Sequence, residues 1–352
     1  MGPGRDSIKA MKAVQLTAPG RPGELRFNEL GDPKPLPDEV VVSVHACGLN
    51  RLDLWTEEGA LPIPVELPRV PGCEIAGEIV QLGADVDQWR IGDRVSIQSN
   101  LFCGDCHYCR RGEDSICLRA RLIGVECDGG FAELVKAPAR CLARLPDGVT
   151  FEAAAVLSLA GSTAMHMLTD RTEVRPGDTV LVIGASSGVG SAGIQIARQL
   201  GARVITTGST EAKRELGLSL GAEHALDPAD EHWPAEVRRL TDKRGVDAVL
   251  EHVGGDVLKK SLQCLARGGT VVTCGATAGR EVEVPLWPFF VKQHRLIGSY
   301  GRNHADLTAT LQWIAEGRIK PVVHQTLPLT ETASAYALLR DREVLGKILI
   351  KP

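Results

Sequence analysis

The sequence lacks long runs of one chemical character, and these absences exclude several classes of protein. Its most apolar stretch, residues 180–197, is interrupted by serines and glycines and is too polar for a membrane-spanning helix. Forty basic residues stand against forty-four acidic ones, so the formal net charge is only −4, and no long basic run is present. We therefore expect neither a membrane protein nor a nucleic-acid-binding one. Internal repeats are also missing, which excludes a solenoid.

The chain also shows no apolar targeting segment, because residues 1–10 contain no hydrophobic core, and we expect regular structure to begin near Met11. With 352 residues, 43% hydrophobic and 24% charged, the composition is that of a globular protein with room for two domains. Six of the ten cysteines are dispersed, which favours the reducing cytoplasm over a disulfide framework.

The other four cysteines are close together in the sequence, at Cys103, Cys106, Cys109 and Cys117. Four thiolates meet the tetrahedral preference of Zn²⁺ and leave no open position, which is typical of a structural zinc site and not of a catalytic one. His107 lies inside this run, but the shell is complete without it. We predict one structural Zn²⁺ in a lobe over about residues 100–118.

The pattern of the chain changes near Phe151. The preceding residues are rich in proline and glycine and carry short β-branched runs, which predict a mainly β domain. From Phe151 onward, apolar strands alternate with amphipathic helices, which is typical of a parallel α/β sheet. The strands expected in this sheet cover residues 179–184, 203–208, 246–251, 270–275 and 295–299. A final strand over residues 347–350 is expected to return to the first domain.

A glycine-rich turn, Gly184 to Gly190, follows the first of these strands and leads into a helix. Glycines let the backbone approach a pyrophosphate, and the helix N-terminus supplies free N–H groups and a positive dipole end. This context predicts a dinucleotide site in which Ser187, Gly188 and Val189 contact the cofactor.

The end of the second strand bears on which dinucleotide is bound. An NAD site normally carries an acidic side chain there for the ribose 2′-hydroxyl, whereas this chain has Gly208. Ser209, Lys213 and Arg214 follow and offer a hydroxyl and two cations to a 2′-phosphate, so NADP(H) is preferred. Glu211 keeps NAD(H) open, and a solvated helix face is the alternative role for the two cations.

A cysteine-rich lobe in a β domain, followed by this nucleotide fold, resembles the medium-chain dehydrogenase/reductase superfamily, which includes zinc alcohol dehydrogenases and quinone oxidoreductases. The resemblance spans residues 11–352. It is carried further by Gly72-x-Glu74-x-x-Gly77, Gly92-Asp93-Arg94-Val95, Gly129-Gly-Phe-Ala-Glu133, Glu251-x-Val-Gly254 and Gly346-Lys347.

This resemblance implies an α/β protein of two domains with the active site in the cleft between them. The GroES-like β-rich catalytic domain would cover residues 11–150 and 301–352, and the doubly wound Rossmann domain residues 151–300. A small-molecule substrate and a homodimer or tetramer are implied as well. The family places further residues near the cofactor, at positions that correspond here to Thr163, Val253, Gly275, Ala276, Ser299 and Lys347.

The chain departs from zinc alcohol dehydrogenases where that resemblance places the catalytic zinc ligands. The three positions hold Asn50, Cys73 and Leu159, and leucine cannot bind a metal. Cys73 and the adjoining Glu74 fall short of the three good ligands that a catalytic zinc normally uses. Asn50-x-x-Asp53 resembles instead the signature of zinc-independent quinone oxidoreductases, although that branch generally lacks the four-cysteine lobe. We predict that the structural zinc is kept and the catalytic zinc is lost.

Chemistry without a metal Lewis acid favours a conjugated acceptor, because hydride addition to an enone or a quinone moves charge onto an oxygen that hydrogen bonds can stabilise. We therefore expect an NADPH-dependent reductase of α,β-unsaturated carbonyls or quinones. Asn50 is expected to donate to the developing oxyanion, Asp53 to orient its neighbours or to cap a helix, and Tyr300 to line the cleft or to pack at a domain seam.

Three questions stay open at this point. Cys73 and Glu74 are both candidates for the proton donor, and Glu74 fits a buried structural carboxylate equally well. A zinc-dependent alcohol dehydrogenase that uses Cys73 and Glu74 as ligands is the second reading of the function. A non-catalytic NADPH-binding protein is the third, because a fold alone does not establish an activity.

Overall fold

The structure is a computed structural model that describes residues 10–352, and the chain forms two compact units. The first unit contains the described residues up to Leu159 together with Val323–Pro352, and the second contains Ala160–Val322. Residues 151–159, which we expected in the Rossmann domain, belong to the first unit. Residues 301–322, which we expected in the first domain, belong to the second unit. The reason is that α9 (His304–Ala315) buries Leu307 and Leu311 and packs against α3 (Ala160–His166).

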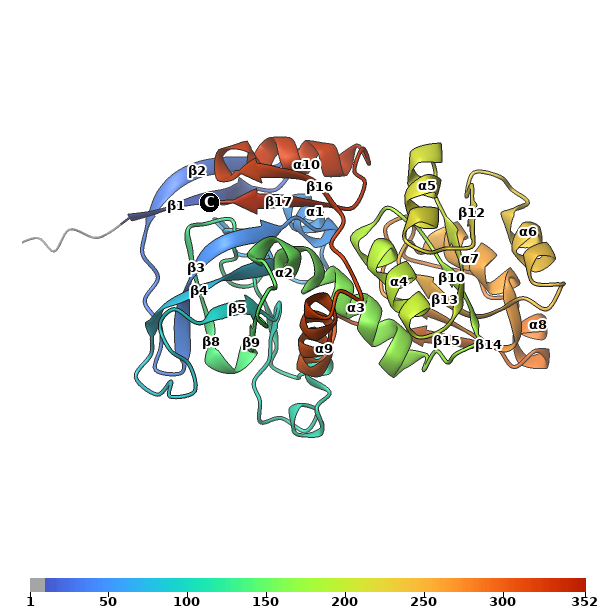
Figure 1. Ribbon diagram of the computed structural model, residues 1–352. Coiled ribbons are helices and arrows are strands. Elements are labelled where there is room, and N and C mark those ends of the chain that lie inside the picture. The colour runs from blue at the N-terminus through green and yellow to red at the C-terminus, as the bar shows by residue number, and fades with distance from the viewer. Residues whose placement is uncertain (1–9) are drawn as a thin grey trace, which may run out of the picture. The chain divides into compact units, whose positions relative to one another are not determined.

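The first unit is built on a mainly antiparallel sheet of seven strands (Figure 1). In spatial order the path is β16 (Val323–Pro328), β17 (Lys347–Lys351), β3 (Glu39–Gly48), β4 (Glu74–Leu82), β5 (Arg94–Ile97) and β9 (Leu142–Arg144), and β8 (Leu134–Pro138) also pairs with β3. Two smaller antiparallel pairs are β1 (Ala10–Ala18) with β2 (Glu24–Gly31) and β6 (Asn100–Leu101) with β7 (Arg121–Leu122). The helices are α1 (Arg51–Glu57), α2 (Phe151–Leu157) and α10 (Thr332–Arg340).

The long strand β3 organises this unit, because it pairs with β4, β8 and β17. Val40, Val41 and Val42 are all buried, so both faces of the strand are covered and the polar-apolar alternation of a half-exposed strand is absent. The chain returns at its C-terminal end, as expected, and adds β17 beside the carboxyl end of β3.

The second unit is a parallel sheet of six strands with helices in the connections, which confirms the predicted doubly wound α/β fold. In spatial order the strands are β12 (His224–Leu226), β11 (Arg203–Thr207), β10 (Thr179–Val182), β13 (Val246–Glu251), β14 (Leu265–Thr273) and β15 (Arg295–Gly298). The remaining helices are α4 (Gly188–Gln199), α5 (Glu211–Ser219), α6 (Trp233–Leu240), α7 (Gly255–Gln263) and α8 (Leu286–Val291).

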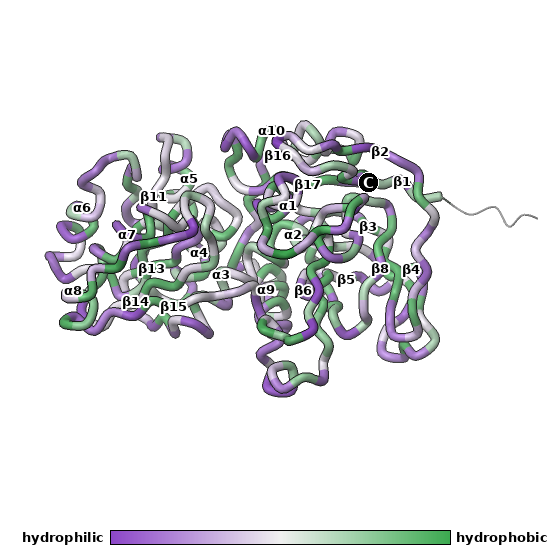
Figure 2. Tube along the Cα trace, turned by 180° about the vertical axis from the view of Figure 1, so that it is seen from behind, coloured by the Kyte–Doolittle hydropathy of each residue, from purple (hydrophilic) through white to green (hydrophobic). Residues whose placement is uncertain are grey.

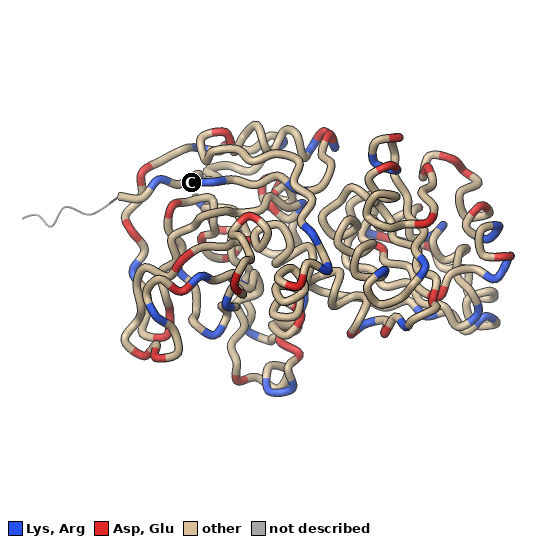
Figure 3. The backbone as a smooth tube through the Cα atoms, viewed as in Figure 1, with Lys and Arg blue, Asp and Glu red and all other residues tan. Residues whose placement is uncertain are grey.

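Buried aliphatic side chains form the core of this sheet, among them Leu181, Val249 and Val271. Part of β13 is accordingly drawn in the hydrophobic colour in Figure 2. The helix α4 buries Ala192, Ile196 and Ala197, three members of the apolar stripe predicted from their spacing. Figure 3 shows Lys and Arg in blue and Asp and Glu in red, and both kinds of charge are distributed along the backbone of each unit.

Over residues 10–352, no helix is by itself long and apolar enough to cross a membrane. Only α2 together with the helical segment 160–171 reaches that length and hydropathy, as a bent pair. Most residues of α2 and α3 are buried in the protein, as is usual for core helices.

Candidate functional site

The four clustered cysteines come together in the loop between β6 and β7. Their sulfur atoms lie within 4.8 Å of one another, and over residues 10–352 they are the only group of three or more potential ligands so gathered. Neighbouring sulfurs are 3.4 Å (Cys117 and Cys103), 3.5 Å (Cys106 and Cys109), 3.8 Å (Cys103 and Cys109) and 3.9 Å (Cys106 and Cys117) apart. These separations are far longer than the roughly 2.05 Å of a disulfide bond. They are close to the roughly 3.8 Å expected between thiolates bound tetrahedrally at about 2.3 Å from zinc.

The backbone around this group also favours thiolates. The backbone N–H groups of Cys103 and Arg119 donate to the Cys117 sulfur at 3.3 and 3.4 Å. Gly112, which follows the 3₁₀ turn Cys109–Arg111, has a φ of 78°, a conformation that other residues rarely adopt. The residues present therefore suit a structural zinc ion, whereas His107 is exposed and packs edge-on against Tyr108.

A buried polar cluster forms at a second place in the first unit, where three strands meet. Gly48, at the end of β3, is paired with Glu74 of β4 and with Leu349 of β17. Asn50 follows as the N-cap of α1, and Lys347 is the first residue of β17. The register of the sheet thus brings Asn50, Glu74 and Lys347 together, and we call these three residues the Lys347 cluster.

The Lys347 ammonium group is the centre of the cluster. Its Nζ donates to the Asn50 side-chain oxygen and to the Leu49 carbonyl, both at 2.6 Å, and lies 2.8 Å from Glu74 Oε2. The Lys347 side chain is only 5% exposed and that of Glu74 is 0% exposed. A buried carboxylate requires a paired charge and further hydrogen bonds, and Lys347 supplies that charge.

Asn50 uses both ends of its amide within the cluster. Its Oδ1 accepts from Lys347, and its Nδ2 donates to the Gly48 carbonyl and to Glu74 Oε2, each at 3.0 Å. The role of Asn50 as a donor to a substrate oxyanion stays a prediction, and both of its amide hydrogens already have acceptors. Asn50 can contact a substrate oxygen only by exchanging one of these partners.

The other positions at which the resemblance places catalytic zinc ligands also make contacts that do not need a metal. The backbone N–H of Leu159 donates to Glu74 Oε1 at 2.6 Å, and its side chain packs against the core of the unit. Cys73 is fully buried, and burial, followed by the nearby Asp53, Cys47 and Glu74 groups, raises the pKa of its thiol well above the usual value. Cys73 is therefore held as a neutral thiol inside the core, and Glu74 is the buried, paired carboxylate that was one of its two predicted roles.

Asp53 caps the helix that begins beside the cluster. Its Oδ2 accepts from the Asn50 backbone N–H at 2.7 Å and its Oδ1 from the Gly72 N–H at 3.1 Å. Burial raises the pKa of Asp53 to about 6 even though both hydrogen bonds act in the opposite direction. Of the two predicted roles, helix capping is the one that these contacts support.

The glycine-rich turn in the second unit has the local geometry of a phosphate-binding turn. Gly184 has a φ of 74°, and a Cβ atom on Gly190 would lie 2.0 Å from the Gly184 carbonyl oxygen. Ser187 is the N-cap of α4, where its hydroxyl accepts from the Gly190 N–H at 2.8 Å and lies 3.0 Å from His252 Nε2. Gly188 and Val189 form the first turn of that helix, where free backbone N–H groups can meet an anion.

The end of β11 holds the residues that bear on the choice of dinucleotide. A Cβ atom on Gly208 would lie 2.9 Å from the Arg214 backbone nitrogen, so a longer side chain there would clash. The Arg214 guanidinium donates to the Gly208 carbonyl at 2.9 Å and to Asp227 at 3.2 Å. Thr210 caps α5 by accepting from the Lys213 N–H, whereas Ser209 and Glu211 are exposed.

Sequence reasoning gave no role to Glu251, which lies at the same carboxyl edge of the sheet as the glycine-rich turn. Glu251 is fully buried at the end of β13 and accepts from the backbone N–H groups of Val253 and Gly254 at 2.6 and 2.7 Å. A Cβ atom on Gly275 would lie 2.2 Å from the His252 carbonyl oxygen, so the loop of Gly275 and Ala276 passes very close to that segment. The signal for Glu251 in the sequence is the Glu-x-Val-Gly motif that it begins.

The other predicted residues are spread over both units. Thr163 is buried in α3, Ser299 follows β15, and Tyr300 is 55% exposed, all in the second unit. Lys347, which was predicted beside the cofactor, has its ammonium group held by Asn50 and Glu74 in the first unit. Its place in the polar cluster was missed, and only the closing Gly-Lys pair marked it in the sequence.

Comparison with known proteins places these two units together in a single family. The model for the GroES-like domain of alcohol dehydrogenases matches residues 36–147, and the model for zinc-binding dehydrogenases matches residues 188–316. Alcohol dehydrogenase 1 of Emericella nidulans is 33% identical over 98% of this chain and 99% of its own length. The acryloyl-coenzyme A reductase of Metallosphaera sedula is 32% identical over 97% of this chain and 99% of its own length.

Solved structures agree with these sequence matches. An NAD-dependent alcohol dehydrogenase is 38% identical, with a TM-score of 0.92 over 97% of this chain and 100% of its own. A zinc-binding dehydrogenase from Sinorhizobium meliloti 1021, solved bound to NADP, is 27% identical, with a TM-score of 0.87 over 98% of this chain and 100% of its own.

Proposed function

This chain belongs to the medium-chain dehydrogenase/reductase superfamily, and we propose that it is an NADPH-dependent reductase of α,β-unsaturated carbonyl compounds that works without a catalytic zinc ion. The relatives are dehydrogenases and reductases, and the chain matches them over nearly their whole length. The chain is therefore an oxidoreductase of this superfamily. The acceptor, the cofactor preference and the absence of a second metal are the steps proposed here.

The observation that carries the proposal is the ammonium group of Lys347, which contacts Asn50, one of the three positions where the resemblance would put a catalytic zinc ligand. Asn50 and Glu74 both direct oxygen atoms at this cation, at 2.6 and 2.8 Å. A second, divalent cation at the same place would face the repulsion of a buried positive charge. The side chain of Leu159 contributes no ligand, so these positions offer at most one thiol and one amide, short of three good zinc ligands.

The cluster supports the polarisation of a substrate carbonyl through Asn50. A cation that binds the amide oxygen draws electron density from the amide and makes its N–H groups better donors. When one of these hydrogens moves from the Gly48 carbonyl to a substrate oxygen, it can stabilise the negative charge that develops there. Lys347 acts in this scheme as a positioning residue, because it touches Asn50 and not the reacting atoms.

A conjugated acceptor is suited to this modest polarisation. Addition of hydride to the β-carbon shifts the electron pair to the carbonyl oxygen, and the α-carbon then takes a proton. When bound, NADPH supplies the hydride. The name of the acryloyl-coenzyme A reductases, two of which are at least 30% identical to this chain, specifies a conjugated thioester. We therefore propose conjugated thioesters and enones as the acceptor class, with quinones as a second class.

The preference for NADP(H) is supported by the end of β11. Position 208 carries no carboxylate, and the Arg214 guanidinium donates to the Gly208 carbonyl beside it. The turn at Gly184, the N-terminus of α4 at Ser187 and the loops after Glu251 and Thr273 would hold the pyrophosphate and the nicotinamide half.

The proposal is tested by cofactor oxidation with NADPH and NADH side by side, against acryloyl-coenzyme A, an enone, a quinone and an aldehyde. We expect the highest kcat/KM with NADPH and a conjugated acceptor, and Arg214→Ala should reduce the preference for NADPH by about tenfold or more. Zinc analysis on the same sample should give about one ion per chain.

Two outcomes would favour the other readings. The alcohol dehydrogenases among the relatives support a zinc-dependent alcohol dehydrogenase as the second candidate function. Two zinc ions per chain, with alcohol oxidation that a chelator abolishes, would establish that candidate and refute the proposal. Tight NADPH binding without oxidation on any acceptor of the panel would support the non-catalytic reading.

A further inference from the structure

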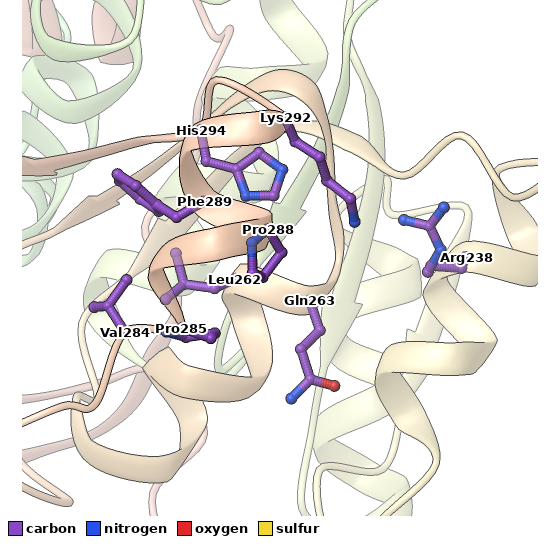
Figure 4. A pocket seen from close by; sticks show the side chains of 9 residues that line it. All are labelled: Arg238, Leu262, Gln263, Val284, Pro285, Pro288, Phe289, Lys292 and His294. Atoms are coloured by element: carbon purple, nitrogen blue, oxygen red, sulfur yellow. The ribbon is translucent and has the colours of Figure 1, made fainter.

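A cavity of about 170 Å³ lies in the second unit between α6, α7 and α8 (Figure 4). Its walls are apolar and include Leu262, Pro285 and Phe289. This volume is below the roughly 300–1,000 Å³ of pockets for drug-sized ligands, so the cavity suits a small molecule.

The topology separates this cavity from the dinucleotide site. His294, which lines the cavity, directly precedes β15, and the helices α6 and α7 reach it with their C-terminal ends, at Arg238 and Leu262. Because these helices lead into β13 and β14, the cavity lies at the amino ends of the parallel strands. The glycine-rich turn follows the carboxyl end of β10, at the opposite edge of the sheet.

The charged groups that line the cavity are all basic. Arg238 of α6 and Lys292 of the loop after α8 join His294, and no aspartate or glutamate is among the lining residues. In Figure 4 the Lys292 side chain extends from its loop toward the side on which Arg238 lies. Two cations without a lining carboxylate make a cavity of positive potential, which attracts an anion.

His294 provides an independent sign of a ligand. It is only 9% exposed, and its Nε2 is buried without a hydrogen-bond partner in residues 10–352. Its ring is packed edge-on against Phe289, with 6.2 Å between centroids, and the Ala266 carbonyl accepts the hydrogen bond of the ring. A buried polar atom without a partner is costly and uncommon, and Nε2 belongs to a side chain that lines the cavity.

We propose that this cavity binds a small organic monoanion, with its carboxylate held by Lys292, Arg238 and His294 Nε2 and its apolar body against Leu262 and Phe289. The basic groups account for the charge of the ligand. The apolar walls account for its organic body, which an inorganic anion lacks.

The state of His294 makes this binding depend on pH. Burial, followed by the Lys292 charge, lowers the pKa of His294, and Arg238 lowers it further, whereas the bond to Ala266 raises it. The free ring is therefore neutral near neutral pH, and because the ring donates to the Ala266 carbonyl, its buried Nε2 carries a lone pair. A bound carboxylate favours the protonated ring, whose Nε2–H can donate to it, so binding takes up a proton and becomes tighter as the pH falls.

The test is calorimetric titration of the full chain with benzoate, with benzyl alcohol as the neutral control of the same shape. We expect benzoate to bind at least about tenfold more tightly than benzyl alcohol, and more tightly at about pH 5.5 than at about pH 8. Lys292→Met should weaken benzoate binding by about tenfold or more. Arg295→Met removes a charge from the adjoining strand outside the cavity and should change affinity by less than about twofold.

Two further variants address folding and position. His294→Phe keeps an aromatic ring against Phe289 and should remove the pH dependence of binding, and thermal unfolding checks that each variant is folded. Benzoate that fails to bind at millimolar concentration, benzyl alcohol that binds equally well, or Lys292→Met with unchanged affinity would each overturn the proposal. Inorganic phosphate that competes as well as benzoate would overturn the organic class of ligand.

Discussion

The four-cysteine lobe and the Lys347 cluster both lie in the first unit, and both gather electron-rich atoms around a small space. In the lobe, four sulfurs surround that space at separations that suit a tetrahedral metal. In the cluster, the space is taken by the ammonium group of Lys347, which Asn50 and Glu74 contact directly. The same fold can therefore place a metal at one site and a protein cation at the other.

The difference comes from the softness and number of the ligands. Thiolates bind zinc strongly, and four of them complete its coordination without help from the rest of the fold. A carboxylate and an amide are weaker ligands for zinc, and a buried carboxylate is stabilised equally well by a paired ammonium group. One ammonium is enough here, because Glu74 also accepts from Asn50 and from the Leu159 N–H.

Removal of one sulfur ligand should have the largest effect on stability. It should disrupt the four-cysteine lobe and leave the Lys347 cluster intact. We expect Cys109→Ser to release the zinc and to destabilise the lobe by several kcal/mol, because structural zinc contributes about 10–16 kcal/mol in small peptides. Zinc content per chain and thermal unfolding measure both effects. Cys127→Ser alters a nearby half-buried cysteine outside the group and should keep the zinc; equal zinc content in the two variants would contradict the assignment.

Loss of the buried cation should have the next largest effect. Lys347→Met leaves Glu74 buried without its counter-charge, and we expect kcat to fall by about 100-fold or more with a stability loss of about 3–5 kcal/mol. Lys347→Arg should restore part of kcat. The matched control is Lys351→Met on the same strand, where an exposed ion pair with Glu152 is lost and little should change.

The binding of NADPH separates two roles for Lys347. A positioning residue for Asn50 should lower kcat and leave the dissociation constant for NADPH unchanged in Lys347→Met. A weakened affinity for NADPH with unchanged kcat would instead support the role in cofactor binding that the family resemblance implies.

Titration of Asp53 should have the smallest effect of the three. Folding raises the pKa of Asp53 from 3.8 to about 6. Between pH 3.8 and about 6, Asp53 therefore keeps its proton in the folded state and loses it in the unfolded state. The contribution to stability is therefore present below about pH 4 and is lost as the pH rises to about 6, with a change of roughly 3 kcal/mol. Chemical unfolding of wild type and Asp53→Asn over this range should show a wild-type advantage that shrinks with rising pH. An advantage that grows would mean that the hydrogen bonds from Asn50 and Gly72 outweigh burial.

Local patterns were sufficient for the elements whose partners are near in sequence. The cysteine lobe spans 15 residues from Cys103 to Cys117, and its spacing predicted the gathering of sulfurs that the structure contains. The parallel sheet and the turn at Gly184 followed from a strand, a glycine turn and an amphipathic helix in succession. The position of residues 301–322 did not follow, because the apolar face of α9 could pack against either unit, and its contact with α3 decides the matter.

What the sequence by itself determined is the chemistry available at each site: four thiols in the lobe, and asparagine, cysteine and leucine at the positions of a catalytic metal. What only the tertiary structure decided is how those groups are occupied. Lys347 is 297 positions from Asn50, and the pairing of β17 with β3 brings the two together. Hydrogen-bonded strand register carries no local signature over such a separation, so the cation that Asn50 and Glu74 contact could not be read from the motif around them.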